Sequence, residues 1–226
     1  MTNSVTLLGA LVRPADFKVA PGGTSIYEVT LAGERTTTDE QGDPRIKPWY
    51  VRAFALGKLA DALNARQFSP GTVLYAHGVL DYTTFPLAEG AGKGSTTRVK
   101  IASLQTALGD WDVTWDHHAA RLRGGVNEVE LSGNLTRDAE TTITGSGLLS
   151  RATLGVTTYG ANQQARQGYF NLKGWRDQAR PIQDLRKGAG LVAHGAVMSE
   201  SYPDPTDAAR TRTAVHIDVT RALRLG

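Results

Sequence analysis

Cysteine is absent from this chain of 226 residues. The protein therefore has no disulfide, no zinc–thiolate site and no thiol nucleophile. Long hydrophobic runs are also absent, because no apolar stretch approaches the roughly 20 residues that a membrane-spanning helix needs. The N-terminus lacks the basic start and apolar core of a signal peptide, and residues 1–9 are typical of a β-strand. These absences predict a soluble, cytoplasmic protein.

A strong charge of one sign is missing too. The chain has 25 basic and 22 acidic residues and a net charge of +3, which by itself does not identify a nucleic-acid partner. Its 40% hydrophobic content is sufficient for packed cores. The 25 glycines, set among Val, Thr and Leu, favour short strands joined by turns.

Sequence motifs that indicate catalysis are also absent. The glycine-rich segment that ends Gly92-Lys93-Gly94 lacks the Lys-Ser/Thr ending of a phosphate-binding loop, and no nucleophile–base pair or acidic metal cluster is present. His117 and His118 are adjacent, so in extended chain their rings point to opposite sides and do not share a metal ion. We expect no enzymatic activity, no cofactor, no metal and no small-molecule substrate.

An internal repeat organises the chain. The alternating stretch that begins at Asn3 (Asn-x-Val-x-Leu-x-Gly-x-Leu-x-Arg) returns at Asn127, an offset of 124 (127 − 3). Later matches keep the same order while the offset falls to 116 between Ile101 and Ile217 (217 − 101), as insertions and deletions in loops produce. Two copies of one domain-sized unit account for nearly the whole chain.

Each copy predicts strands and one short helix. The expected elements of copy one are strands at residues 5–12, 25–34, 50–56, 72–82 and 98–104, a polar loop at 35–48 and a helix at 58–66. Copy two repeats this order with a helix at 177–185, which Pro181 is expected to distort. The fold class is therefore all-β with one short helix per domain, as two tandem OB folds, which are five-stranded Greek-key barrels. We place OB fold 1 at residues 1–108, an inter-domain connector at 109–125 and OB fold 2 at 126–226.

Specific motifs in both copies resemble the bacterial single-stranded DNA-binding protein (SSB) family. The repeated opening is one of them. The second is the Trp49-Tyr50-x-Arg52-x-Phe54-x-Leu56-Gly57-Lys58 segment, whose counterpart in copy two runs from Tyr169 to Trp175. Most members of this family carry one OB fold per chain, and this chain resembles the branch with two. The resemblance implies a homodimer with four OB folds in total.

The third strand of each copy separates two kinds of side chain by its period of two. In copy one, Tyr50, Arg52, Phe54 and Leu56 share one face, which we predict to be the outer one. In copy two, the corresponding predicted outer residues are Tyr169, Asn171, Lys173 and Trp175. Flat rings and cations suit single-stranded DNA, whose bases stack and whose phosphates need counter-charges.

The resemblance also implies which positions contact DNA. The expected stacking residues are Tyr50, Leu56 and Phe85 in copy one and Tyr159, Tyr169, Trp175 and Tyr202 in copy two. Leu56 departs from the aromatic pattern of the family, and copy one has Thr37 where copy two has Tyr159, so we expect copy two to stack more strongly. The expected phosphate partners are Arg35, Arg52, Lys58, Lys173, Arg176 and Lys187.

The function that this resemblance implies is binding and protection of single-stranded DNA in replication, recombination and repair, next to the nucleoid. Two alternatives stay open. The first is an accessory protein of the primosome or recombination type with mainly protein-interaction roles. It is motivated by the basic ending Arg221–Gly226, where family members usually carry an acidic tail. The second is an OB-fold RNA binder.

Overall fold

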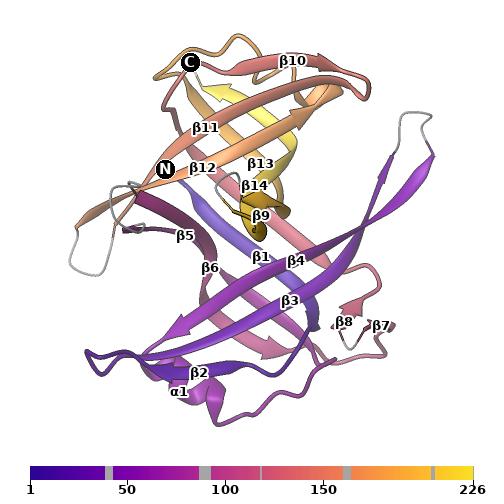
Figure 1. The fold of residues 1–226 in the computed structure, drawn as a ribbon, viewed down its shortest axis with the longest axis vertical. Helices are drawn as coiled ribbons and strands as arrows, with labels where there is room; N and C mark the ends of the chain where they lie inside the picture. Colours follow the sequence, from indigo (N-terminus) through magenta and orange to yellow (C-terminus); the bar gives the residue numbers. More distant parts are fainter. Residues whose placement is uncertain (39–42, 87–92, 118, 160–163, 205–206, 226) are drawn as a thin grey trace. The chain divides into compact units, whose positions relative to one another are not determined.

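The computed structural model describes residues 1–38, 43–86, 93–117, 119–159, 164–204 and 207–225 (Figure 1). These residues form two compact units. We call Val5–Leu80 with Arg98–Asn127 the first unit, and Met1–Ser4 with Asp81–Thr97 and Glu128–Gly226 the second unit. The distal part of one hairpin and the first four residues thus belong with the second copy of the repeat, whereas the boundaries at 108 and 126 stay a prediction.

The first barrel closes through a ring of five strands. They are β1 (Asn3–Leu11), β3 (Ser25–Thr38), β4 (Pro44–Leu56), β5 (Val73–Pro86) and β6 (Lys93–Thr106). Strand β1 pairs antiparallel with both β3 and β5, β3 pairs with β4, and β4 runs parallel to β6 through Ala53↔Val99. Since β5 and β6 are also neighbours, no edge of the ring is open.

The second barrel has the same ring. Its strands are β9 (Val126–Leu135), β11 (Gly147–Tyr159), β12 (Ala165–Trp175), β13 (Gly190–Asp204) and β14 (Asp207–Leu225). Strand β9 pairs with β11 and β13, β11 pairs with β12, β13 pairs with β14, and β12 runs parallel to β14. The predicted fold class, two OB folds in an all-β chain, is confirmed.

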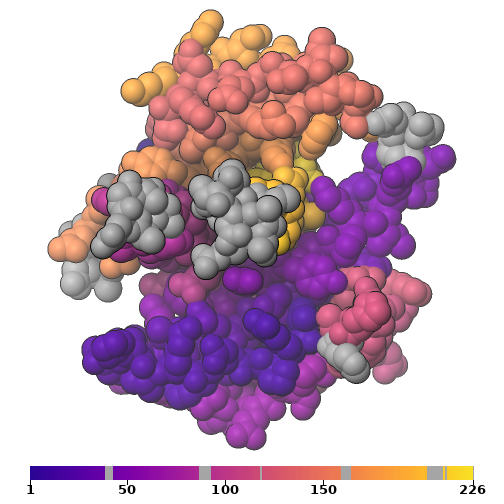
Figure 2. Space-filling view, in the orientation of Figure 1, coloured from indigo at the N-terminus to yellow at the C-terminus, as the bar shows by residue number. Residues whose placement is uncertain are grey.

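Hairpin strands extend both barrels beyond the predicted elements. Short strands β2 (Asp16–Val19) and β10 (Glu140–Thr144) pair with β3 and β11. All four residues of β2 are exposed, and this strand is visible in indigo on the first unit (Figure 2). The prediction of a loop over residues 35–48 is wrong in extent, because β3 and β4 continue pairing as far as Thr38↔Pro44.

A single tryptophan organises the interior of the first barrel. Trp49 is only 1% exposed. A Cβ atom on Gly33 would lie 2.5 Å from Cζ2 of the indole, and one on Gly9 would lie 2.7 Å from its Cη2. Both positions therefore need glycine, because the indole and the backbone oxygens of Ala32 and Gly124 fill the space that a side chain would take.

The two predicted helices have different outcomes. Helix α1 (Lys58–Asn64) begins where expected and ends two residues before the predicted residue 66, and it buries Ala60 and Leu63. The helix predicted at 177–185 is wrong. The structure has only the 3₁₀ helix η1 (Arg176–Gln178), followed by turns. Pro181 has no N–H to donate to the carbonyl of residue 177, so an α-helix does not continue there.

The predicted connector contains a β-hairpin that packs on the first unit. Strands β7 (Val113–Asp116) and β8 (Ala119–Leu122) pair with each other, and β8 joins β3 through Gly33↔Leu122. Leu122 lies in a buried cluster with Val73, and the N–H of Glu34 donates to Gly124 O at 2.8 Å. This hairpin brings residues next to the outer side of β3.

Candidate nucleic-acid interface

The outer side of β4, with the outward residues of β3, forms the surface that we call the β3–β4 face. It consists of Tyr50, Arg52, Phe54 and Leu56 of β4, with Glu28, Thr30 and Glu34 of β3. Cross-strand pairs fix its rows, since Thr30 faces Arg52 and Glu28 faces Phe54. Val51, Ala53 and Ala55 point inward and are buried, as the alternation predicts.

The four β4 side chains of this face are not equally open. Tyr50 and Arg52 are exposed and Leu56 is half-buried, whereas Phe54 is only 5% exposed. Phe54 thus lies on the predicted outer face, but its ring is covered. The physical reason is Arg98 of β6, whose Cζ lies 4.4 Å from the centroid of the Phe54 ring. A guanidinium over a ring face gains cation–π attraction and excludes water from the ring.

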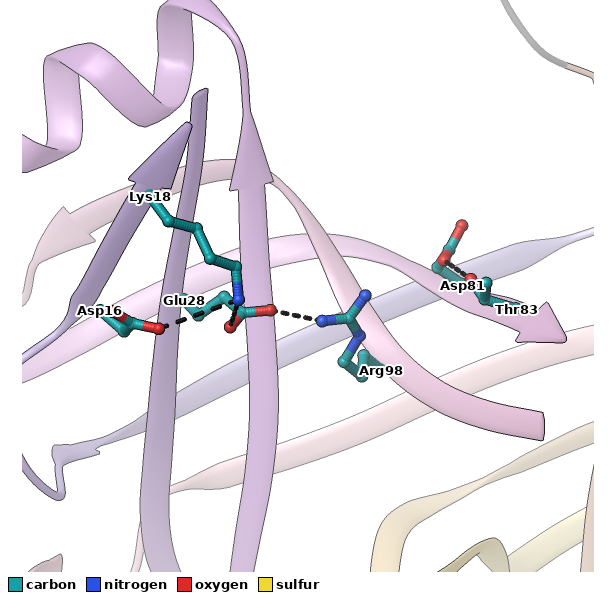
Figure 3. Close-up of polar contacts among 6 residues, drawn as sticks. All are labelled: Asp16, Lys18, Glu28, Asp81, Thr83 and Arg98. Carbon is teal, nitrogen blue, oxygen red and sulfur yellow. Dashed lines mark hydrogen bonds and ion pairs between the residues drawn. The ribbon is translucent and has the colours of Figure 1, made fainter. Parts of the chain in front are cut away.

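Arg98 is held in place by an ionic chain across three strands (Figure 3). Its Nη1 donates to Oε1 of Glu28 at 2.5 Å, and Nζ of Lys18 donates to Oε2 of the same carboxylate at 2.7 Å. Lys18 also lies 3.8 Å from Asp16. Burial raises the pKa of Glu28, but the hydrogen bonds and charges of Lys18 and Arg98 outweigh burial and lower that pKa overall.

A second arginine approaches the face from the β7–β8 hairpin. Arg121 Nε donates to Oε1 of Glu34 at 2.7 Å, and its Nη1 donates to the hydroxyl oxygen of Tyr50 at 3.3 Å. The hydrogen bonds with Tyr50 and Glu34 raise the pKa of Arg121, so its guanidinium stays charged. Since Glu34 is 8% exposed, the pair stands partly out of water and fixes the end of the tyrosine side chain.

The outer side of β12 with the outward residues of β11 forms the β11–β12 face of the second unit. It consists of Tyr169, Asn171, Lys173 and Trp175 of β12, with Arg151 and Thr153 of β11. Phe170, Leu172 and Gly174 point inward and are buried, which confirms the predicted alternation in this strand.

Aromatic and ionic contacts support this second face. Tyr169 is 43% exposed, and its ring forms a T-shaped pair with the ring of Tyr82 at a centroid distance of 5.5 Å and an interplanar angle of 86°. Lys173 Nζ donates to Glu200 Oε2 at 2.5 Å. Trp175 is half-buried, and Arg151 is exposed.

The remaining predicted residues are not among those that define these two faces. Phe85 and Tyr202, on β5 and β13, are 44% and 43% exposed, and both belong to the second unit. Tyr159 ends β11, but its side chain lies outside the described part of the chain. Phe85 was assigned to copy one by the repeat, so the compact unit differs from the sequence copy at this residue.

The other basic residues predicted to contact phosphates differ in exposure and in the elements that carry them. Arg35 is half-buried on β3, and Lys58 is exposed as the first residue of α1. Arg176 has a positive φ of 53° and its Nε donates to Ser146 O at 3.2 Å. Lys187 is exposed, and its backbone N–H donates to Asp138 at 2.8 Å.

Sequence reasoning missed Arg98, Arg121 and their carboxylate partners. Arg98 stands 44 positions after Phe54 (98 − 54), and only the parallel pairing of β4 with β6 brings them together. Arg121 lies in the segment that was predicted to be a connector. Across the described ranges, no group of three or more His, Cys, Asp or Glu side chains is placed to hold a metal ion. No helix among the described elements has the length and hydropathy to cross a membrane.

Comparison with known proteins identifies the family. The profile of the "Single-strand binding protein family" matches residues 2–107 and again residues 126–223. The chain belongs to this family. Its two matched segments cover both barrels, which agrees with the ring of strands seen twice.

Relatives of known name extend along the full chain. The single-stranded DNA-binding protein of Deinococcus radiodurans is 32% identical over 230 residues, covering 99% of this chain and 76% of that protein. The one from Thermus aquaticus is 31% identical over 227 residues, covering 99% and 83%. The crystal structure of the wild-type Thermus aquaticus protein superimposes with a TM-score of 0.77 at 28% identity, covering 100% of this chain and 93% of that one.

Proposed function

We propose that this protein binds single-stranded DNA without reading its sequence, and protects exposed strands in replication, recombination and repair. One observation carries the proposal: an outward aromatic and basic face occurs twice at the same place of the ring, with Tyr50 on β4 and Tyr169 on β12. Family membership supports it, as do the relatives that are named for this activity.

The proposed contacts divide into stacking and phosphate binding. Bases stack on the exposed rings, and sequence tolerance follows because every base has a π-face. The proposed stacking residues are Tyr50, Leu56, Phe85, Tyr159, Tyr169, Trp175 and Tyr202. The proposed phosphate partners are Arg35, Arg52, Lys58, Lys173, Arg176 and Lys187. Phe54 stacks only after Arg98 moves away from its ring.

The proposed assembly is a homodimer with four OB folds, working in the cytoplasm beside the nucleoid and without enzymatic activity. Light scattering is expected to give twice the 24.2 kDa mass of one chain. A mass of one chain at micromolar concentration contradicts the dimer but leaves DNA binding intact.

The test of function is a titration of the intact protein into a fluorescently labelled dT oligonucleotide, followed by anisotropy. We expect tight binding that weakens linearly in log K against log salt, with a slope of about −0.7 per phosphate contacted. Duplex of the same sequence and a U-containing oligonucleotide serve as matched controls, and both are expected to compete poorly. Equal affinity for duplex, or no binding to dT at low salt, overturns the proposal.

A further inference from the structure

The two faces differ in charge at one equivalent position. Tyr50 pairs with Ala32 and Tyr169 with Gly155, which aligns the two registers. Four residues further along β4 and β12, Phe54 pairs with Glu28, whereas Lys173 pairs with Arg151. The first face therefore has a carboxylate where the second has a guanidinium.

Glu28 binds the two cations around it in the way that a phosphate group would. Each of its two oxygens accepts from a different cation, Oε1 from Arg98 and Oε2 from Lys18 (Figure 3). A carboxylate and a phosphate present similar pairs of acceptor oxygens to Arg and Lys. Because its side chain is 26% exposed, the carboxylate lies at the surface, where an incoming strand reaches the same cations.

The same contact also covers a ring. While Glu28 holds Arg98, the guanidinium lies 4.4 Å from the centroid of Phe54, and that side chain stays 5% exposed. Arg151 of the second face is exposed, and its side chain makes no hydrogen bond or ion pair within the part of the chain that the structure describes. At this one position the second face thus offers a cation directly, whereas the first offers Arg98 and Lys18 only by exchange. Elsewhere Arg52 is exposed on the first face, and Lys173 of the second is held by Glu200.

We infer that Glu28 is an internal competitor of DNA phosphates, which holds Arg98 and Lys18 until a strand displaces it and which thereby sets the affinity of the first unit. The inference rests on the proposed function. It assigns to Glu28 the opposite role to the contact residues, because Glu28 lowers the affinity for DNA that they raise. On binding, phosphate oxygens take the place of the carboxylate beside Arg98, and the guanidinium moves with the backbone of the strand. The ring of Phe54 then becomes available for stacking.

The test replaces Glu28 with its uncharged isostere in the full chain. Glu28→Gln is combined with Tyr169→Ala and Trp175→Ala, so that binding to a labelled dT oligonucleotide reports mainly the first unit. We expect affinity at low salt to rise about fivefold or more, and the slope of log K against log salt to steepen by about 1, as one or two further phosphate contacts require. Thermal unfolding of each variant checks the fold.

A matched control removes the same charge elsewhere in the first unit. Asp112 pairs with Arg123 at 3.1 Å, and their side chains are 60% and 63% exposed. Asp112→Asn also breaks a carboxylate–arginine pair, and we expect it to raise affinity less than about twofold, because screening weakens the effect of one exposed charge. Adding Arg98→Gln to Glu28→Gln is expected to remove most of the gain.

The outcomes separate the two proposals. If the wild-type chain does not bind dT, the proposed function fails. If it binds, and Glu28→Gln has the affinity of Asp112→Asn or a lower one, the competitor is overturned and the proposed function stands. Should Glu28→Gln lose its fold, Glu28→Asp replaces it. This variant keeps the charge but is one methylene too short to hold both cations, so a smaller gain is expected, and no gain overturns the inference.

Discussion

The two barrels share a ring of strands but support their outer tyrosines with different chemistry. In the first unit, Tyr50 accepts a hydrogen bond from Arg121, which Glu34 holds. In the second unit, Tyr169 forms a T-shaped ring pair with Tyr82. A polar brace in one copy and an aromatic brace in the other thus support a tyrosine at the same position of the face.

The interiors of the two barrels differ at one cross-strand pair, in which the larger and the smaller residue are on opposite strands. Gly33 faces Trp49 in the first barrel, whereas Val156 faces Gly168 in the second. The larger residue of the pair is thus on the third strand of the ring in the first barrel and on the second strand in the second barrel. Each barrel keeps one large and one small residue at this level, which is how a narrow barrel is filled.

The largest expected effect breaks this interior pair. Trp49→Ala should lower the free energy of unfolding of the first unit by about 4 kcal/mol, because the indole is fully buried and leaves a cavity. Trp49→Phe keeps a ring in the same space and is expected to lose less stability. Calorimetry or chemical denaturation measures both variants. A loss below about 1 kcal/mol contradicts the role given to Trp49.

The next largest effect tests the stacking residues of the second unit. Tyr169→Ala with Trp175→Ala should weaken binding to a dT oligonucleotide by about 100-fold, since two stacks together contribute about 3 kcal/mol. Anisotropy gives the affinity, and circular dichroism verifies that the barrel is intact. Unchanged affinity in a folded variant removes the β11–β12 face from the binding surface.

The polar brace of the first unit has its own test. Arg121→Ala should lower the free energy of unfolding by about 2 kcal/mol, because Glu34 is left nearly buried without its counter-charge. The double variant with Glu34→Gln should recover most of that stability. Arg123→Ala, directly after the end of β8, is the matched control, since its partner is exposed, and we expect a change within about 0.5 kcal/mol. Equal losses for both arginines refute the brace.

Removing the ring of Tyr50 should weaken DNA binding less than removing the rings of Tyr169 and Trp175 together. Tyr50→Ala is expected to weaken dT binding by about tenfold, as removal of one stack does. Tyr50→Phe keeps the ring and removes only the acceptor of Arg121, so its affinity should stay within about twofold of wild type. A loss from Tyr50→Ala larger than that from Tyr169→Ala with Trp175→Ala reverses the expected ranking of the two units.

The smallest effect is the pH dependence that Glu28 brings to the first unit. The pKa of Glu28 is lower in the folded protein than in the unfolded chain. Its ion pairs therefore contribute fully to stability above the pKa of the unfolded state, and this contribution is lost as the pH falls through the pKa of the folded state. Wild type should therefore lose about 1 kcal/mol or less relative to Glu28→Gln on acidification, since the pair is partly solvated. Thermal unfolding at successive pH values from neutral downward measures this. Parallel curves for the two proteins contradict it.

Period-two alternation and the repeat predicted the fold class and the inward face of both third strands. They failed where contacts come from distant segments. Phe54 alternates outward as expected, but the parallel pairing of β4 and β6 brings Arg98 over its ring. No local pattern near residue 54 contains that information, so its burial could not be predicted from the strand alone.

Local chemistry also explains the other differences. Pro181 lies within the expected helix at 177–185, where the structure has only the end of η1 followed by turns. The connector at 109–125 has no counterpart in the other copy, so the repeat gave no template for the hairpin within it. Its strands are only four residues each, too short for alternation to identify them.

The burial of Trp49 has a spectroscopic consequence. The chain has four tryptophans, and on the two faces described above the only one is Trp175. Trp49, enclosed by Gly9 and Gly33, will emit as a constant, blue-shifted background that a quencher in solvent does not reach. With Trp111 and Trp115 changed to phenylalanine, the remaining variable emission would come from a single indole. The protein would then carry an optical reporter for one of its barrels and none for the other.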